Sequence, residues 1–260
     1  MYIFQEKILA KKYKGIILAG GEGTRLYPLT RATSKQLLPI YDLPMVLYPL
    51  NTLLEAGIED LLIITNRKYQ NNYIDLLRDG RGYGVNIDFL IQEKPEGIAQ
   101  AFDLSREWLS DSPSVLILGD NLFLAGNTSQ ILKKAMSKNN GATIFGYKVE
   151  DPSRYGVVVL DERNNITNIE EKPVNPKSNL AVTGLYVYDN KVCDYVKLLE
   201  PSDRGELEIT DLNNIYLSNK SLKLEKLDDK GFWLDAGTKE SLLEASIKVK
   251  ELKEKNKKLF

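Results

Sequence analysis

The chain has 260 residues, of which 43% are hydrophobic and 27% charged, an ordinary composition for a globular enzyme, and no apolar run approaches the roughly 20 residues that cross a membrane. A formal net charge of −1 argues against a broad nucleic-acid surface, and the absence of histidine excludes histidine-based zinc sites and serine–histidine or cysteine–histidine nucleophile pairs. Because Cys193 is the single cysteine, no intrachain disulfide can form, and we expect a cytoplasmic protein in which any metal, Mg²⁺ by preference, rests on oxygen ligands.

The first half of the chain alternates strand-like apolar runs with helical patterns. Strands are predicted at residues 16–19, 61–65, 87–91 and 115–118, and helices at 45–56, 69–77 and 99–109. This alternation is typical of βαβ units, in which helices cover both faces of a mostly parallel sheet. It predicts a Rossmann-like α/β fold.

After residue 142 the pattern changes to closely spaced strands separated by turn-forming residues. Strands are predicted at 143–149, 156–160, 166–169 and 181–188, helices at 190–199 and 208–219, and a last strand pair before a charged helix from Lys239. We interpret this part as a small antiparallel or mixed addition to the central sheet. Because no internal repeat or linker is present, residues 1–260 are predicted to form a single domain, with its core at about 14–247 and a C-terminal helix that frays over 248–258.

The first loop is rich in glycine, since Gly20, Gly21 and Gly23 follow directly after the first predicted strand. Loops at the carboxyl edge of a parallel sheet commonly bind nucleotides, and glycine lets backbone N–H groups approach phosphate oxygens. Arg25 and Lys35 add positive charge nearby. The alternative is a glycine-rich turn with two surface cations. A Walker phosphate loop is disfavoured, because it needs Gly-Lys-Ser or Gly-Lys-Thr where this chain has Gly-Thr-Arg.

Two carboxylates also end predicted strands, Asp120 after Leu116–Gly119 and Asp235 after Gly231–Leu234. Taken singly, an aspartate at a strand end is more often a turn former or a helix cap. In a parallel sheet, however, Asp120 would lie at the same edge as the glycine loop, where a carboxylate is a natural ligand for Mg²⁺.

The string Gly20–Thr30, followed by Ser34–Asp42 and by Pro44 and Met45, resembles the signature of the sugar-1-phosphate nucleotidyltransferases. Among them it is most similar to the glucose-1-phosphate thymidylyltransferases, and the resemblance covers residues 14–247. It implies Mg²⁺-dependent synthesis of dTDP-glucose and pyrophosphate from dTTP and α-D-glucose 1-phosphate, the first step toward dTDP-deoxysugars. It also implies small-molecule substrates, no nucleic-acid or membrane partner, and a homo-oligomer, either a dimer or a tetramer.

The resemblance further implies roles for residues that match the motifs of the family. The expected nucleotide-binding residues are Gly20, Gly21, Gly23, Thr24, Arg25, Lys35, Gln36, Gln92, Gly97 and Asp120. The expected sugar-phosphate-binding residues are Asn121, Tyr155, Gly156, Glu171, Lys172, Val182, Tyr186 and Arg204. Asp120 and Asp235 are expected to hold the metal, and the expected catalytic residues are Arg25, Lys35, Lys172 and Asp120.

Elementary chemistry suits several of these roles. Gln92 offers a donor and an acceptor, the complement of a pyrimidine imide edge. Glu171 can accept hydrogen bonds from sugar hydroxyls, and Lys172 can neutralise a phosphate, although an isolated Glu-Glu-Lys-Pro string is more often an exposed charged turn. The charged string around Gln92, Gln-Glu-Lys-Pro-Glu-Gly, departs from the commoner family strings and leaves the preference for dTTP over UTP open.

Two other functions remain open at this point. The same chemistry could use UTP or another sugar 1-phosphate, or the chain could be a non-catalytic sensor of nucleotide sugars. A glycosyltransferase is disfavoured, because Gly119-Asp120-Asn121 stands where an Asp-x-Asp metal motif would be needed. Longer members of the family carry a further helical segment associated with a regulatory nucleotide site. Because this chain ends at Phe260, we expect reduced or absent feedback inhibition by a dTDP-sugar.

Overall fold

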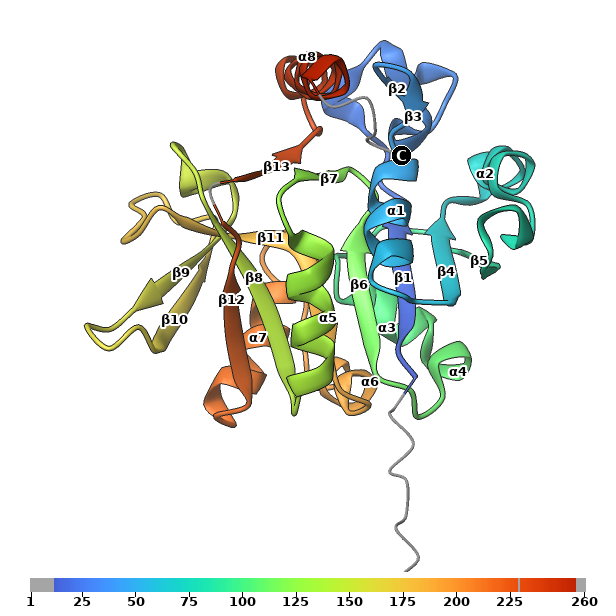
Figure 1. The fold of residues 1–260 in the computed structure, drawn as a ribbon. Coiled ribbons are helices and arrows are strands. Elements are labelled where there is room, and N and C mark those ends of the chain that lie inside the picture. The colour runs from blue at the N-terminus through green and yellow to red at the C-terminus, as the bar shows by residue number, and fades with distance from the viewer. Residues whose placement is uncertain (1–11, 229, 256–260) are drawn as a thin grey trace, which may run out of the picture.

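A nine-stranded mixed sheet with helices on both faces forms the centre of the computed structural model, which describes residues 12–228 and 230–255 (Figure 1). Along the sheet the strand order is β10-β9-β11-β6-β1-β4-β5, and β8 pairs with β11 and β12. The strands are β1 (Lys14–Ala19), β4 (Asp60–Thr65), β5 (Asn86–Ile91), β6 (Ser114–Leu118), β8 (Ala142–Lys148), β9 (Gly156–Leu160), β10 (Ile166–Glu171), β11 (Leu180–Tyr188) and β12 (Leu222–Lys226).

The pairing pattern confirms the expected α/β fold. Strands β6, β1, β4 and β5 are parallel, whereas β11 is antiparallel to β6 and β8, and β9 and β10 form an antiparallel hairpin. The carboxyl ends of β1 and β6 therefore lie side by side, as the positions of the glycine loop and Asp120 require.

The helices mostly begin and end close to their predicted positions. They are α1 (Leu47–Glu55), α2 (Gln70–Leu77), α3 (Gln100–Leu104), α4 (Arg106–Leu109), α5 (Thr128–Lys138), α6 (Val192–Val196), α7 (Ile209–Ser218) and α8 (Lys239–Lys255). The single helix predicted at 99–109 is two short helices, because the backbone at Ser105 (φ −91°, ψ 5°) leaves helical geometry. Short 3₁₀ turns complete the loops at Thr24–Leu26, Leu29–Arg31, Lys35–Leu37, Arg67–Tyr69, Arg81–Tyr83 and Pro152–Arg154.

The prediction of a last strand pair is wrong, because the two strands belong to different sheets. Strand β12 joins the central sheet beside β8, while β13 (Gly231–Asp235) pairs antiparallel with β7 (Asn121–Ala125). The physical reason is that their apolar side chains enter different clusters: Leu222 and Leu224 of β12 pack against the core on one sheet face, and Phe232 and Leu234 of β13 pack under α8.

Strand β7 and helix α5 were not anticipated from the sequence. Only Leu132 and Ala135 of α5 are buried, so the apolar periodicity of this helix is too sparse to stand out. A short antiparallel pair, β2 (Pro39–Ile40) with β3 (Leu43–Pro44), was also missed.

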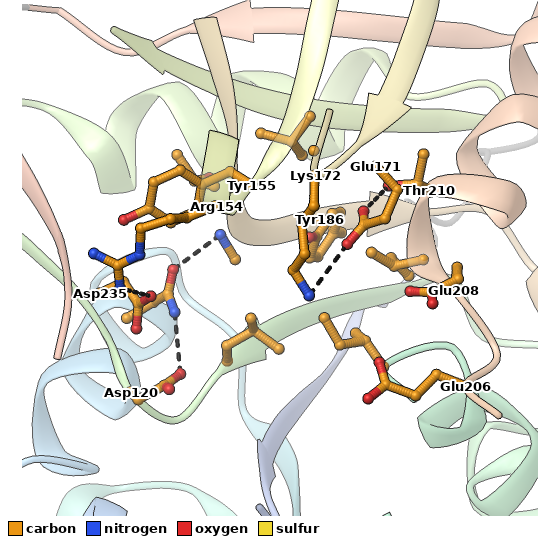
Figure 2. Close-up of a pocket in the computed structure, with 18 of the residues that line it drawn as sticks. Asp120, Arg154, Tyr155, Glu171, Lys172, Tyr186, Glu206, Glu208, Thr210 and Asp235 are labelled. Atoms are coloured by element: carbon orange, nitrogen blue, oxygen red, sulfur yellow. Dashed lines mark hydrogen bonds and ion pairs between the residues drawn. The ribbon is translucent and has the colours of Figure 1, made fainter. Parts of the chain in front are cut away.

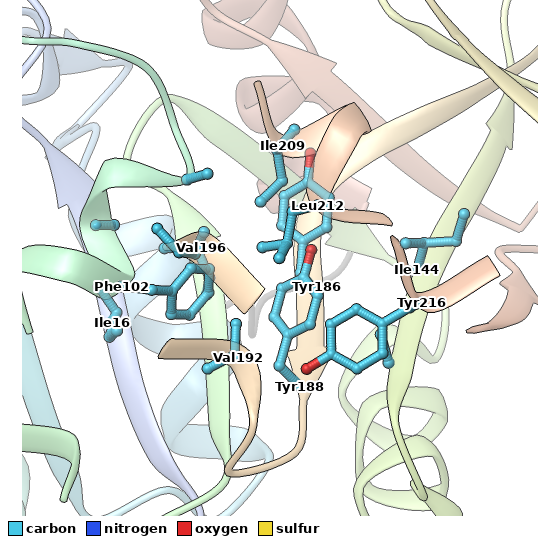
Figure 3. Packing of buried hydrophobic residues seen from close by; sticks show 14 of the residues in the cluster. Ile16, Phe102, Ile144, Tyr186, Tyr188, Val192, Val196, Ile209, Leu212 and Tyr216 are labelled. Carbon is cyan, nitrogen blue, oxygen red and sulfur yellow. The ribbon is translucent and has the colours of Figure 1, made fainter. Parts of the chain in front are cut away.

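Apolar residues fill both faces of the central sheet. On the face covered by α3, α6 and α7, Tyr188 packs edge-on against Phe102 with ring centroids 5.1 Å apart and lies 5.5 Å from the ring of Tyr216 (Figure 3). Its hydroxyl is 2.6 Å from Asn213 Oδ1, so the ring is buried without leaving its polar atom unpaired. Helices α1, α2 and α5 cover the opposite face. Within the described ranges, no helix is both long and apolar enough to traverse a bilayer.

Helix α8 packs across the β7–β13 pair. Its buried Ala245 and Val249 contact a separate cluster that includes Leu122 and Leu124 of β7. The predicted charged helix is therefore anchored along one side rather than wholly solvated. It continues to Lys255, and the remaining part of the predicted frayed tail lies outside the described residues.

Candidate active site

A cavity of about 410 Å³ opens at the carboxyl end of β6, with Asp120 and Asp235 on one side and Glu171, at the end of the β9–β10 hairpin, on the other (Figure 2). Many of the residues singled out from the sequence meet there. Those that line it are Arg25, Asp120, Asn121, Tyr155, Gly156, Glu171, Lys172, Val182, Tyr186, Arg204 and Asp235.

The two aspartates lie next to each other. Asp120 follows β6, and Asp235 ends β13, where it is paired in register with Asn121 of β7. The backbone N–H of Ala236 donates to the carbonyl of Asp120 over 3.0 Å, which ties the two strand ends together. The expectation that these carboxylates converge is therefore met by the geometry.

The two carboxylates differ in how well their charges are compensated. Burial raises the pKa of Asp120, but the Lys35 ammonium that ion-pairs with it, helped by the Asn121 amide 3.1 Å away, holds this pKa below its usual value. Burial and the adjacent Asp120 charge raise the pKa of Asp235, whose ion pair with Arg154 Nη2 is long at 3.8 Å. A further positive charge beside Asp235 would relieve this imbalance.

This donor set fits a hard divalent cation. In the described residues, no cluster of three or more acidic, cysteine or histidine side chains is able to hold a metal. The ligands that the protein would supply to a cation here are therefore the two carboxylates of Asp120 and Asp235. Mg²⁺ commonly binds through one or two carboxylates, with waters and phosphate oxygens as its other ligands. The pair is thus suited to a cation that binds together with phosphate groups.

Asn121 connects the strands around the carboxylates. Its Oδ1 accepts from the backbone N–H of Gly184 (3.0 Å) and from Nε1 of Trp233 (2.6 Å), while its Nδ2 donates to Asp120. A Cβ at Gly184 would lie 2.5 Å from Asn121 Oδ1, so only glycine allows this approach. Gly184 and Trp233 were not predicted as site residues, although Trp233 lies within the motif that contains Asp235.

The glycine loop brings two cations to the same side of the cavity. Gly23 has a φ of 64°, and a Cβ there would lie 3.0 Å from Lys35 Cβ, so glycine is required both by the backbone and by the packing of Lys35. Arg25 and Asp235 both lie close to Gly237. A Cβ placed on Gly237 would be 2.9 Å from Arg25 Nη2 and 2.9 Å from Asp235 Oδ1.

The opposite wall carries a second charged group. Glu171 Oε1 lies 3.3 Å from Arg204 Nη2 and 3.5 Å from Lys172 Nζ, and Glu171 Oε2 accepts from the Thr210 hydroxyl over 2.5 Å. Lys172 has a φ of 42°, an uncommon backbone conformation for a residue with a side chain. Arg204 is also held by Glu208, whose two carboxylate oxygens are both 2.8 Å from Nη2.

Aromatic rings and one further arginine complete the cavity. The Tyr155 and Trp233 rings pack edge to face with centroids 5.0 Å apart, and Arg154 lies over the Tyr155 ring. Arg154, Thr210 and Glu208 were not predicted from the sequence as site residues. Arg154 directly precedes the Tyr155 motif, and the other two belong to the Arg204 string. All three could therefore have been found by examining the neighbours of residues already predicted.

The remaining predicted residues are not among those that line the cavity. They are Gly20, Gly21, Gly23, Thr24, Lys35, Gln36, Gln92 and Gly97. Lys35 forms an ion pair with Asp120, which lines the cavity, and Gln92 packs against Gly20. Gln36 is buried, and its Oε1 accepts from the Ser34 hydroxyl over 2.9 Å.

Comparison with known proteins finds one family throughout. Residues 14–251 match the nucleotidyl transferase family. A glucose-1-phosphate thymidylyltransferase of Neisseria gonorrhoeae is 52% identical over 233 residues, which cover 90% of this chain and 81% of that protein.

Solved structures of similar shape have related names. A candidate glucose-1-phosphate thymidylyltransferase from Bacillus anthracis, in complex with a sucrose, has a TM-score of 0.84 and 42% identity, covering 92% of this chain and 96% of that one. A UDP-glucose pyrophosphorylase complexed with UDP-glucose has a TM-score of 0.80 and 26% identity, covering 92% and 98% of the two chains.

Proposed function

Because the chain belongs to the nucleotidyl transferase family, we propose that it is an enzyme that makes dTDP-glucose and pyrophosphate from dTTP and α-D-glucose 1-phosphate. The name of the Neisseria gonorrhoeae relative supports the choice of substrates. The observation that carries the proposal is a single cavity with the Asp120 and Asp235 carboxylates on one wall and Glu171, Lys172 and Arg204 on the other.

The reaction needs charge compensation more than proton transfer. A phosphate oxygen of the sugar phosphate forms a bond to the α-phosphorus of dTTP, the bridging bond to the β-phosphate breaks, and its electron pair leaves with pyrophosphate. The attacking phosphate is already an anion at neutral pH, so a chain without histidine lacks nothing essential. Positioning two polyanions and stabilising the developing charge are the main tasks of the protein.

The cations on the two sides of the cavity would divide this work. Arg25 and Lys35, beside the glycine loop, would bind the triphosphate, with backbone N–H groups of Gly20–Thr24 adding donors. Lys172 and Arg204, on the opposite wall, would bind the attacking phosphate. This division would place the attacking sugar phosphate on the side of the α-phosphorus opposite the leaving pyrophosphate, as an in-line attack requires.

The residues of this opposite wall that do not bind phosphate would set the orientation of glucose. Glu171 is held by Thr210 and Arg204, so its oxygens are fixed acceptors for sugar hydroxyls. The expected roles of Asn121, Tyr155, Gly156, Val182 and Tyr186 are to shape this wall, and all five line the cavity.

We further propose that the cation is Mg²⁺ and that Asp120 and Asp235 hold it. When bound, it would neutralise phosphate charge and join the nucleotide to the sugar phosphate. The raised pKa of Asp235 and the oxygen-only donor set support this assignment. For the base, Gln92 beside Gly20, with Gly97 in the following loop, supports recognition of a pyrimidine imide edge.

A substrate panel tests the proposed function. Purified protein with Mg²⁺ is given dTTP, UTP, dCTP or ATP together with glucose, galactose or glucosamine 1-phosphate, and pyrophosphate release is measured. We expect dTTP with glucose 1-phosphate to be used best. A higher kcat/KM with UTP would favour the alternative suggested by the UDP-glucose pyrophosphorylase likeness, and no release with any pair would leave the sensor alternative.

The carboxylate and arginine roles have their own test. Asp120→Asn or Arg25→Ala should lower turnover by about a hundredfold or more, on the order of 3 kcal/mol of lost transition-state stabilisation. Glu107→Gln, which changes an exposed acid on α4, is the matched control and should leave turnover within about twofold. Near-normal turnover in a folded Asp120→Asn variant would contradict the mechanism.

We also propose that the enzyme is cytoplasmic and acts as a homo-oligomer, a dimer or a tetramer. The lone cysteine and the family resemblance support this. Light scattering during size exclusion should give a multiple of the 29.4 kDa chain mass, and a mass equal to one chain would contradict it.

A further inference from the structure

The amide of Gln92 is held by a chain of hydrogen bonds that leads away from the cavity. Gln92 Nε2 donates to Gln100 Oε1 over 2.6 Å. The same oxygen accepts from the backbone N–H of Glu96 (3.1 Å), and Gln100 Nε2 donates to the Glu96 carboxylate (2.8 Å). Gln92 is only 3% exposed, so its contacts with protein decide how its amide lies.

The direction of this chain is set by groups that cannot reverse their polarity. The backbone N–H of Glu96 can only donate, and an ionised carboxylate can only accept. Gln100 must therefore turn its oxygen toward the N–H and its nitrogen toward the carboxylate. Because that oxygen also faces Gln92, Gln92 must present its nitrogen to Gln100. One of two otherwise equivalent amide orientations is selected.

The backbone at Glu96, whose N–H begins this series of hydrogen bonds, is itself anchored. The N–H of Leu207 donates to the carbonyl of Glu96 over 2.7 Å, and the N–H of Ala99 donates to the carbonyl of Leu207 over 3.2 Å. Between them, Gly97 has a φ of 105°, and a Cβ there would collide with the Leu207 carbonyl. The loop cannot turn the Glu96 N–H away without breaking these contacts.

The selected orientation leaves the oxygen of Gln92 facing Gly20. A Cβ on Gly20 would overlap this oxygen, so the two groups are in close contact. Among the described residues, none donates a hydrogen bond to Gln92 Oε1. This oxygen is also not one of the unpaired atoms that are fully buried, so part of its surface is accessible. The site therefore offers a free acceptor, with the second Nε2 hydrogen as the donor beside it.

We propose that Gln100, held by Glu96, is a positioning residue that makes this site select pyrimidines with an N3–H, thymine and uracil, over cytosine. This inference rests on the proposed nucleotidyltransferase function. Thymine and uracil pair an N3–H and a carbonyl with the locked acceptor and donor. Cytosine presents the reverse order, an N3 acceptor and an N4 amino donor, so it would need Gln92 turned over. Its rejection then costs the hydrogen bonds to Gln100 as well.

Nucleotide selectivity tests whether Gln100 holds the Gln92 amide in this orientation. Gln100→Leu leaves Gln92 free to turn over, so the ratio of kcat/KM for dTTP to that for dCTP should fall by at least about tenfold. A merely structural defect would lower both values together and leave the ratio unchanged. An unchanged ratio in this variant would overturn the proposal.

A double variant provides the rescue. In Glu96→Gln with Gln100→Glu, residue 100 still accepts from Gln92 and from the backbone N–H of residue 96, and residue 96 now donates to it. The ratio should return to within about threefold of the original, whereas a ratio as low as that of Gln100→Leu would contradict the lock. Glu93→Gln, which removes a charge in the same loop whose partner is Arg67, is the control and should not change the ratio.

Failure of this inference can be told apart from failure of the proposed function. If the unchanged protein releases pyrophosphate from no nucleotide, the proposed function fails. If it uses dTTP or UTP and discriminates against the cytosine nucleotide, but the discrimination survives in Gln100→Leu, the inference alone fails.

Discussion

At the scale of single residues, several of the cations in and around the cavity are paired with acids of the protein. Lys35 pairs with Asp120, Arg154 with Asp235, and Arg204 with Glu171 and Glu208. A bound phosphate would have to exchange with these carboxylates, which keeps the cations in place and limits the cost of their burial. Asp235 has the weakest compensation, so the effect of a metal ion should be clearest there.

Asp235→Asn separates stability from metal binding. Removing one of two adjacent carboxylates should raise Tm in metal-free buffer by a few degrees, on the order of 1 kcal/mol. Millimolar Mg²⁺ should raise the Tm of the unchanged protein and have little effect on the variant. Differential scanning fluorimetry measures both, with Glu107→Gln as the control. An equal Mg²⁺ response in the two proteins would show that Asp235 is not a ligand.

Cys193 gives a pH-dependent prediction. Burial raises the pKa of its thiol, which contacts the Phe102 carbonyl at 3.3 Å. The reactive thiolate therefore appears only above the usual pH range, and at about pH 8 iodoacetamide should modify the native protein at least about a hundredfold more slowly than the unfolded chain. The native rate should rise as the pH increases. Mass spectrometry follows the modification, and rapid native labelling at neutral pH would contradict the buried position.

At the scale of elements, the β7–β13 pair joins the two acidic strand ends. Asp120 immediately precedes β7, Asp235 ends β13, and Asn121 bonds to Trp233 across the pair. Helix α8 covers this pair from the outside, so its packing supports the carboxylates indirectly.

Val249→Ala tests the contribution of this helix. The side chain is buried in the apolar cluster that α8 shares with β7, so shortening it should lower the free energy of unfolding by about 1–2 kcal/mol. Leu243→Ala on the same helix is the matched control, because Leu243 is 62% exposed and its loss should cost less than about 0.5 kcal/mol. Urea unfolding measures both. Equal losses would mean that α8 does not dock as described.

At the scale of the whole molecule, one sheet continues from β5 at one edge to β10 at the other. The glycine loop follows β1 near the middle of the sheet, and the cavity wall with Gly156, Glu171 and Tyr186 is built on β9, β10 and β11. Because both parts share one hydrogen-bonded sheet and its packed faces, we predict that they form a single domain that unfolds in one step.

The two tryptophans allow this prediction to be tested. Trp108 lies on α4 and Trp233 on β13, at separate places in the molecule. In Trp108→Phe and in Trp233→Phe, urea unfolding followed by the remaining tryptophan should have the same midpoint as unfolding of that variant followed by far-UV circular dichroism. Midpoints that differ by more than about 0.5 M would indicate two independently unfolding parts.

Much of this protein could be predicted from the sequence because the information is local. The apolar runs at 61–65 and 115–118 and their alternation with helices determine the parallel sheet. The glycine loop, Asp120 and Asp235 stand in short contiguous motifs at strand ends, so their chemical character can be recognised without knowing what lies opposite. Helix α5 could not be predicted in this way, because only two of its residues, Leu132 and Ala135, are buried.

Only the tertiary structure decided which of these residues meet. The adjacency of Asp120 and Asp235 depends on β13 pairing with β7 rather than with β12, and the orientation of Gln92 depends on a loop anchored to Leu207. Such contacts join residues far apart in the chain, and strand order and packing set their distances. A local pattern determines which side chains are available, whereas their approach depends on the burial of apolar surface across the whole fold.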